Sequence, residues 1–225
     1  MEAMDDGNGY IVVLNGTGGA GKSTLAQALQ ASAPRPFIHL GIDAFLTGLP
    51  RQYVGFGPRS GEGLRFRADS DGRVTMLEAG PVMHRLIKGM HRAVAAMAAS
   101  GCSVIVDHVL WEQEWLADCA LVLPTALFVG VRCSREMVQE RTRKRGDRPP
   151  GYELFAFDAV HAERPYDVEV DTTDQDITRC VAQILGRSAR PAEGLMALRA
   201  SSIAARHQSA AVELASVSWS WRAAW

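Results

Sequence analysis

Short segments with the pattern of buried strands alternate along this chain with longer stretches in which apolar positions recur every three or four residues. The strand patterns occupy residues 11–14, 37–43, 103–107, 127–132 and 166–171. Helical spacing is clearest from Glu78 to Ser100, where the recurring apolar positions are Val82, Leu86, Met90, Val94 and Met97. Similar spacing follows the first strand pattern and also follows the last one. The chain is therefore predicted to form strands and amphipathic helices in turn.

The first strand pattern leads directly into the sequence Gly16-Thr-Gly-Gly-Ala-Gly-Lys-Ser23, which matches a phosphate-binding loop. Glycines allow the backbone N–H groups of such a loop to surround a polyphosphate, and the next helix adds the positive end of its dipole. Lys22 is predicted to reach the β- and γ-phosphates of ATP, and Ser23 to bind Mg²⁺. The predicted nucleotide-binding residues of this loop are Gly16, Thr17, Gly18, Gly19, Ala20, Gly21, Lys22, Ser23 and Thr24.

A glycine-rich turn can match such a short motif by chance. Here an apolar run, Ile11 to Leu14, precedes the motif, and Leu25, Ala28 and Leu29 continue after it with helical spacing. A strand before the loop and a helix after it are the structural context that the motif requires. The context favours nucleotide binding over a chance match.

Asp43 ends the second strand pattern. In open parallel sheets, ligands lie beyond the carboxyl ends of the strands, so Asp43 is expected to lie where a second substrate would face the phosphate-binding loop. This position predicts a catalytic role. The alternative is that Asp43 only caps the N-terminus of a helix over residues 44–49.

The third strand pattern ends in Asp107 and His108. An acidic residue at this point can hold Mg²⁺ directly or through water, so Asp107 joins Ser23 as a predicted metal-binding residue. His108 has two interpretations, a hydrogen-bonded structural group or a catalyst, and the first is the commoner for a histidine at a strand end.

A basic cluster follows the fourth strand pattern. Arg141, Arg145 and Arg148 have the spacing of one helical face, and they are predicted to close over the triphosphate as catalytic lid residues. A solvated surface face is the alternative, as for the neighbouring pair of Glu140 and Lys144.

Residues 50–77 are rich in glycine, arginine and charge. A hairpin around Asp71-Gly72 is predicted between residues 64–67 and 73–76. The whole stretch has two interpretations, a lid or specificity loop, or a solvated insertion.

Composition limits the possible classes of protein. The chain has 225 residues, 47% hydrophobic residues, and a formal net charge of −1, which gives no reason to expect a nucleic acid or a membrane as partner. Its four cysteines are scattered, which indicates a reducing compartment. The acidic N-terminus lacks the apolar core of a signal peptide, so a cytoplasmic protein is expected.

Three segments are expected along the chain. Residues 1–9 have the composition of a flexible leader, residues 10–186 form the folded domain, and residues 187–225 form a C-terminal tail rich in alanine, serine and tryptophan. The tail is expected to be partly helical or disordered and to lie outside the catalytic unit.

Several motifs together resemble the chloramphenicol phosphotransferase family of antibiotic kinases. They are Asn15 to Ser23, Gly41-Ile-Asp43, Val106-Asp107, Gly130 to Cys133, Arg145 to Arg148 and Tyr166 to Thr173. The resemblance covers residues 10–186. It implies an α/β P-loop nucleotide-kinase fold, with a five-stranded parallel sheet and helices on both faces. It also implies transfer of the γ-phosphate of ATP to a hydroxyl group of a small antibiotic, chloramphenicol or a similar compound.

The resemblance also assigns roles to residues. Asp43 matches the carboxylate that accepts the proton of the substrate hydroxyl, and the three arginines match the lid. The loop around Thr172 and Thr173 is implied to lie near the adenine. The family's third strand ends in a motif like Asp-Asp, whereas this chain has Asp107-His108.

Two other functions remain open from the sequence. One is a P-loop kinase of another hydroxylated acceptor: another antibiotic, a sugar nucleotide as in zeta-type toxins, or a metabolite. The other is an ATP-binding regulator without enzymatic activity. The sequence gives no indication of oligomeric state.

Overall fold

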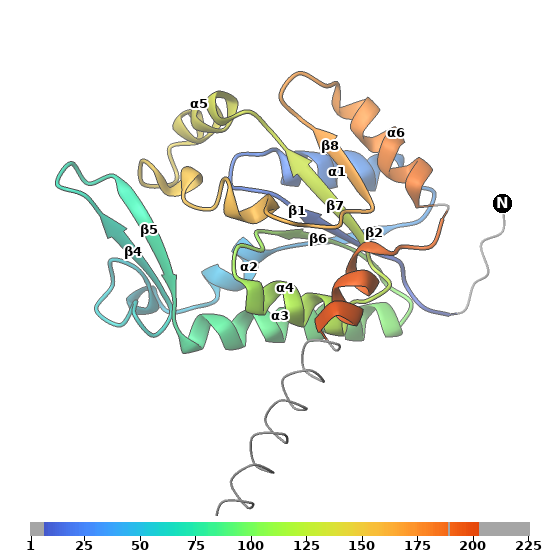
Figure 1. Ribbon diagram of the computed structural model, residues 1–225, viewed down its shortest axis with the longest axis horizontal. Coiled ribbons are helices and arrows are strands. Elements are labelled where there is room, and N and C mark those ends of the chain that lie inside the picture. The colour runs from blue at the N-terminus through green and yellow to red at the C-terminus, as the bar shows by residue number, and fades with distance from the viewer. Residues whose placement is uncertain (1–6, 189, 203–225) are drawn as a thin grey trace, which may run out of the picture.

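A five-stranded sheet forms the centre of the computed structural model, which describes residues 7–188 and 190–202. Its strands are β1 (Ile11–Asn15), β2 (Phe37–Gly41), β6 (Ser103–His108), β7 (Leu127–Arg132) and β8 (Val168–Asp171), in the order β2-β6-β1-β7-β8 (Figure 1). Every neighbouring pair is parallel. The predicted five-stranded parallel sheet is confirmed.

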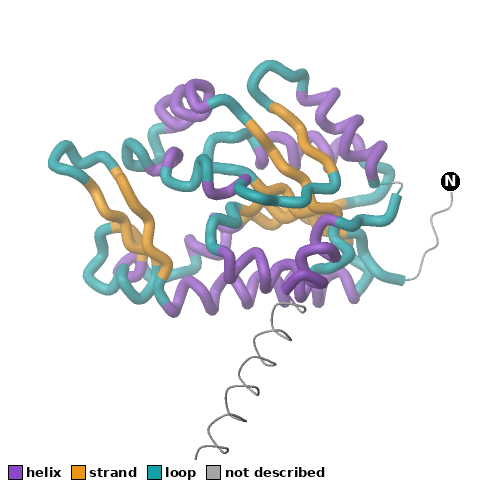
Figure 2. The backbone as a smooth tube through the Cα atoms, viewed as in Figure 1, coloured by secondary structure: helices purple, strands orange, loops and turns teal. Residues whose placement is uncertain are grey.

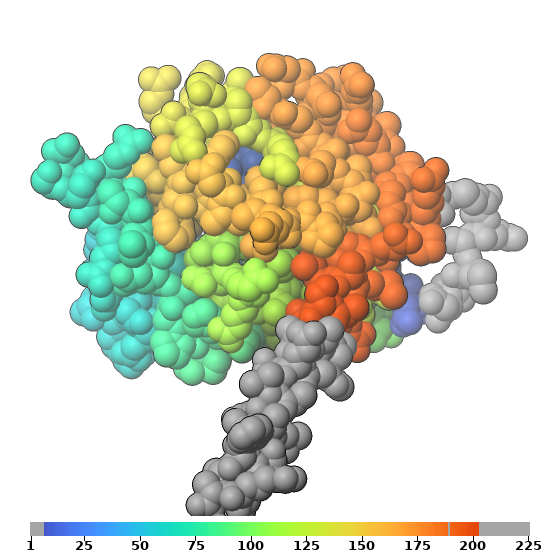
Figure 3. Space-filling view, viewed as in Figure 1, coloured from blue at the N-terminus to red at the C-terminus, as the bar shows by residue number. Residues whose placement is uncertain are grey.

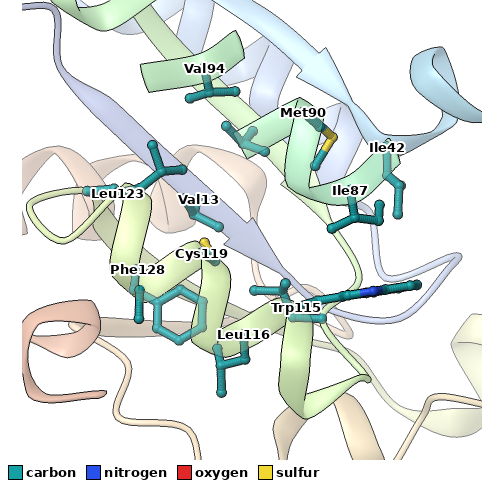
Figure 4. Close-up of a cluster of buried hydrophobic side chains, with 14 of the residues drawn as sticks. Val13, Ile42, Ile87, Met90, Val94, Trp115, Leu116, Cys119, Leu123 and Phe128 are labelled. Atoms are coloured by element: carbon teal, nitrogen blue, oxygen red, sulfur yellow. The ribbon is translucent and has the colours of Figure 1, made fainter. Parts of the chain in front are cut away.

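Helices cover both faces of this sheet, as predicted (Figure 2). On one face lie α1 (Lys22–Ser32) and α6 (Ile177–Arg187), and on the other lie α2 (Ile42–Thr47), α3 (Pro81–Ala99) and α4 (Gln113–Val122). The alternating side chains of β1 show how the faces divide, because Val12 and Leu14 pack with α1 whereas Val13 packs with α3 and α4. The core on the α3 and α4 face of the sheet includes Ile87, Met90 and the fully buried Trp115 (Figure 4).

A smaller sheet lies beside the domain and contains the predicted hairpin. It consists of β3 (Val54–Gly55), β4 (Leu64–Ala68) and β5 (Val74–Ala79), and β4 pairs antiparallel with β5. The hairpin projects from the rest of the surface (teal in Figure 3). Its base is attached to the domain, because the N–H group of Val74 donates to the carbonyl of Pro150 at 2.8 Å. The insertion is therefore partly docked and not freely solvated.

Helix α5 (Arg135–Arg145) follows β7, and two short 3₁₀ helices, η2 (Tyr152–Leu154) and η3 (Ala159–His161), follow α5. A further 3₁₀ helix, η1 (Arg51–Tyr53), precedes β3. Within the part of the chain that the structure describes, no helix is long and apolar enough to cross a membrane.

The domain extends further along the chain than the predicted boundary at residue 186. Residues 194–202 are helical, and Leu195 is fully buried in the core that contains α3 and α4. Asp167 fixes the start of this segment, since its Oδ1 accepts hydrogen bonds from the N–H groups of Glu193 (2.7 Å) and Gly194 (3.1 Å). The weak apolar periodicity of the tail concealed this anchor, because it depends on a few apolar side chains, chiefly Leu195 with the partly buried Leu198. The predicted tail beyond residue 202, with its tryptophans, lies outside the described residues.

Replacing Leu195 by alanine is expected to lower the free energy of unfolding by about 2–5 kcal/mol, since it removes a fully buried side chain and leaves a cavity. The matched control is Met196→Ala, at a neighbouring position that is 50% exposed and should therefore matter much less. Urea denaturation of both variants measures the difference. Equal stability of the two variants would show that this segment is not part of the folded unit.

Candidate active site

The glycine-rich loop connects the carboxyl end of β1 with the first residue of α1 (Figure 1). Gly21 immediately precedes α1 and has a φ of 83°, a conformation that other residues rarely adopt. The loop therefore takes the turn that its sequence motif predicts, at the N-terminal end of an 11-residue helix. An anion placed here would meet both backbone N–H groups and the positive end of the helix dipole.

Lys22 folds back over this loop and is 6% exposed. Its Nζ donates to the carbonyls of Gly16 (2.9 Å) and Thr17 (2.8 Å) and lies 3.4 Å from Oδ1 of Asp107. The ammonium group is thus held close to the space that the loop surrounds. Its contact with the β- and γ-phosphates of ATP stays a prediction.

Ser23 and Asp107 come together from separate elements. The hydroxyl of Ser23 donates to Oδ2 of Asp107 at 2.6 Å, which joins the first turn of α1 to the end of β6. Burial alone would raise the pKa of the Asp107 carboxyl, but Lys22, the nearby His39 and the Ser23 hydroxyl hold that pKa well below its usual range. The group is therefore an anion with hard oxygen atoms at neutral pH.

These two side chains fit the chemistry of Mg²⁺, which prefers oxygen ligands and is usually bound by one or two protein groups together with substrate phosphates. The residues described in the structure contain no cluster of three or more His, Cys, Asp or Glu side chains that could hold a metal ion on its own. Ser23 and Asp107 remain the candidates for such a shared site.

Asp43 lies in the first turn of α2, on the border of the same cleft as the loop. The N-cap residue of α2 is Gly41, so the alternative interpretation of Asp43 as the N-cap is wrong. Its side chain is 53% exposed, and Oδ1 accepts a hydrogen bond from Nη2 of Arg148 at 2.7 Å. The predicted base therefore faces the cleft and is paired with one of the predicted lid arginines.

The three arginines line the cleft, but they do not share one helical face. Arg141 lies on α5, whereas α5 ends at Arg145 and the chain reverses at Gly146. Arg148 thus lies beyond the helix, where it pairs with Asp43. The Cζ atom of its guanidinium group lies 4.9 Å from the centroid of the Tyr152 ring. The predicted helical face is wrong for Arg148, since the glycine ends the helix before it. Arg145 is exposed and pairs with Asp147 at 2.7 Å.

Thr172 and Thr173 lie behind the loop, outside the lining of the cleft. The hydroxyl of Thr172 donates to the carbonyl of Ala20 at 2.7 Å. The backbone carbonyl of Thr172 accepts a hydrogen bond from Nη2 of Arg141 at 2.7 Å. Thr173 accepts from the N–H group of Ser134 at 2.7 Å. Thr172 thus connects the loop to Arg141, one of the predicted lid residues, and contact of either threonine with adenine stays a prediction.

Replacing Thr172 by valine is expected to raise the KM for ATP about tenfold, because the loop loses the hydrogen bond that fixes Ala20 while the side-chain volume is kept. Initial rates at varied ATP concentration measure this. Thr75→Val, on the exposed side of β5, is the control and should leave KM unchanged. An unaltered KM in the Thr172 variant would contradict the supporting role.

The cleft has a volume of about 420 Å³. Its polar lining includes the loop, Asp43, Asp107, Glu153 and the basic residues of the segment after β7. Its apolar lining comprises Ile42, Leu46, Leu77, Val109, Trp111 and Ala156. The space is thus large enough for a small molecule, and its lining contains both charged and apolar side chains.

Asn15 was not predicted to take part in the site, although it organises it. Its Nδ2 donates to the carbonyl of Val160 (2.9 Å) and to the hydroxyl of Tyr166 (2.8 Å), and its Oδ1 accepts from the N–H group of Leu110 (2.8 Å). A buried amide at the end of β1 therefore holds three segments around the cleft. The signal in the sequence was a polar residue at the end of an apolar run.

His108 points away from the cleft into the core between the sheet and α3. Its Nδ1 accepts a hydrogen bond from the N–H group of Val109, so the ring proton is on Nε2. This Nε2 atom faces Nε2 of His91 at 3.0 Å. His91 in turn contacts Asp118 at 2.7 Å. Burial and the neighbouring His91 hold the pKa of His108 well below its ordinary value, so the ring is neutral at pH 7. This arrangement favours the structural interpretation of His108.

A phosphate-binding loop and an acidic residue on the border of one cleft, at the carboxyl edge of a five-stranded parallel sheet, define a P-loop kinase. The family model described as Chloramphenicol phosphotransferase-like protein matches residues 9–189. The chain belongs to this family and is a kinase-type phosphotransferase, so the predicted family is confirmed.

Curated relatives agree with this assignment, and solved structures share the fold. Proteins of Mycobacterium tuberculosis strains CDC 1551 and H37Rv, named for a proposed O-phosphotransferase activity, are each 35% identical over 178 residues, 77% of this chain and 78% of the relative. The fold is similar to that of the M. tuberculosis APS kinase CysC bound to AMPPNP and APS, with a TM-score of 0.56, 14% identity, and coverage of 81% of this chain and 99% of that chain. A gluconokinase from Sinorhizobium meliloti gives a TM-score of 0.52, 19% identity, and coverage of 82% and 93%.

Proposed function

We propose that this protein transfers the γ-phosphate of ATP to a hydroxyl group of a small molecule. The observation that carries the proposal is the placement of Asp43 on the border of the same cleft as the loop and Lys22. The family, and the names of its relatives in M. tuberculosis, support an O-phosphotransferase. Nucleotide binding is supported by the likeness in fold to a kinase bound to AMPPNP.

In the proposed reaction the acceptor oxygen attacks the terminal phosphorus, the bond from this phosphorus to the β,γ-bridging oxygen breaks, and ADP leaves. Asp43 takes the proton of the hydroxyl as the new bond forms. Arg148 contacts Oδ1 of Asp43, and this contact keeps the Asp43 carboxylate directed into the cleft. Lys22, Arg141 and Arg145 would offset the charge of the transferring group, the main catalytic contribution in phosphoryl transfer.

The metal is part of the same proposal. Ser23 and Asp107 would hold Mg²⁺, which when bound neutralises phosphate charge and orients the terminal group. The chain itself contributes the short contact between these two side chains, and it holds the Asp107 carboxylate beside Lys22 before any ligand enters.

For the acceptor we propose chloramphenicol or a similar antibiotic, with resistance as the biological result. The family description supports this choice, and the apolar lining of the cleft suits a molecule with an apolar body. Action in the cytoplasm, on a small molecule and without a nucleic-acid partner, stays a prediction from the sequence.

The test is incubation of the purified protein with ATP, Mg²⁺ and a panel of hydroxylated compounds, chloramphenicol included, followed by mass spectrometry. Gain of one phosphoryl group by an antibiotic is the expected result. Phosphorylation of a sugar nucleotide or a metabolite alone would overturn the antibiotic assignment. A protein that binds ATP and phosphorylates nothing in the panel would overturn the proposed enzyme in favour of a regulator.

A further inference from the structure

Glu153 is a buried acidic residue in the lining of the cleft that the proposed mechanism does not use. It lies in η2, is 6% exposed, and borders the cleft together with Tyr152 and Ala156. Among the described residues, no hydrogen-bond partner reaches its buried Oε2 atom. A buried acceptor without a donor is unfavourable, and a fold rarely keeps one unless a ligand or water satisfies it.

The backbone around Glu153 is fixed from two sides. Its carbonyl accepts a hydrogen bond from the hydroxyl of Thr17, in the phosphate-binding loop, at 2.6 Å. On the other side, β5 is hydrogen-bonded to Pro150, and Gly151 turns with a φ of 87° against the backbone of Val74. Because both attachments hold η2 in place, the carboxyl group cannot reach solvent by a simple movement of the segment.

The surroundings of this carboxyl group identify the kind of partner. The lining of the cleft also contains the apolar side chains of Ile42, Leu46, Leu77 and Trp111, which offer no hydrogen-bond donor to a carboxylate apart from the indole N–H group of Trp111. The cationic groups of the cleft have other partners: the loop carbonyls for Lys22, Asp43 for Arg148, the carbonyl of Thr172 for Arg141, Asp147 for Arg145 and Glu140 for Lys144. A molecule that fills the cleft can therefore supply the donor that Glu153 lacks.

We propose that Glu153 binds the acceptor by taking a hydrogen bond from a donor group other than the hydroxyl that is phosphorylated. Building on the function proposed above, this defines the acceptor as an alcohol with an apolar body and a second donor, such as another hydroxyl. One end of the molecule meets Asp43 and the phosphate, the apolar body meets Trp111 and Leu77, and the second donor meets Glu153.

Two probes that differ in one hydroxyl test this directly. They are 1-phenyl-1,3-propanediol and 3-phenyl-1-propanol, which share a phenyl ring and a primary alcohol. Their affinities are measured by NMR titration of the full-length protein in the presence of AMPPNP and Mg²⁺. The wild-type protein is expected to bind the diol about 10–100-fold more tightly, the range for satisfying a buried acceptor that otherwise lacks a donor.

The variants separate recognition from folding. Glu153→Leu should abolish the preference for the diol while leaving the affinity for the mono-alcohol unchanged, and Glu153→Gln should retain part of it. The matched control Glu193→Gln, at an exposed position, should retain all of it. In thermal unfolding without ligand, Glu153→Leu should have a Tm equal to or above that of the wild type, because an unpaired buried acceptor has been removed.

Equal affinity of the two probes for the wild type, or no binding of either, overturns the proposal. So does a Glu153→Leu variant that keeps the preference, or one that loses both affinity and stability, which would indicate a structural role. Transfer of label from [γ-³²P]ATP to the probes is measured separately. Binding with the expected preference but no transfer refutes only the proposed function, whereas transfer without preference refutes only the role of Glu153.

Discussion

Lys22→Ala is expected to lower kcat/KM by about 10²–10³-fold, the range seen when one group that stabilises transition-state charge is removed. The reason is position: Nζ lies within hydrogen-bond distance of the carbonyls of Gly16 and Thr17, at the centre of the loop. Both the affinity for ATP and the rate of the chemical step should fall. Steady-state rates at varied ATP concentration, together with nucleotide titration, measure the two effects.

The control for this variant is Lys88→Ala. Lys88 pairs with Glu114 on the surface and does not line the cleft, so its removal should leave both parameters unchanged. If Lys22→Ala retained the ATP-dependent activity of the wild type, the loop would not be the triphosphate site.

Asp43→Asn is expected to lower kcat by about 10²–10⁴-fold, the usual contribution of a general base, while the KM for ATP stays within about twofold. Asparagine keeps the shape of the side chain, and its amide oxygen can still accept the hydrogen bond from Arg148. Only the ability to take a proton is lost. Single-turnover measurements with the accepted substrate separate this loss from a change in binding.

Asp158→Asn is the matched control, because Asp158 is 84% exposed and pairs with Arg135 outside the cleft. It should behave as the wild type does. Full turnover by Asp43→Asn would remove the base from the mechanism, and Arg148 would then pair with a carboxylate that has only a structural role.

The sequence was sufficient to predict the elements of the site that depend on short local patterns. The loop from Gly16 to Ser23 needs glycines at fixed positions, and parallel strands bring their carboxyl ends to one edge of the sheet. This is why Asp43 and Asp107 could be placed on the nucleotide side of the fold from strand patterns alone.

Other features depend on contacts between segments far apart in the sequence. Arg148 reaches Asp43 only because α5 ends before it, so helical spacing gave the wrong relation to Arg141. Leu195 joined the core through the anchor at Asp167, and nothing in its neighbours indicates this. Glu153 is buried because the loop and β5 are attached on either side of it, and no local pattern in the sequence indicates this burial.

The most direct test of the central claim is a crystal structure of the protein with AMPPNP and Mg²⁺. We predict a triphosphate surrounded by the N–H groups of the loop, with Lys22 on its β- and γ-phosphates and the terminal phosphate facing the Asp43 carboxylate across an open acceptor space. A nucleotide bound outside the loop, or a terminal phosphate directed away from Asp43, would contradict the account.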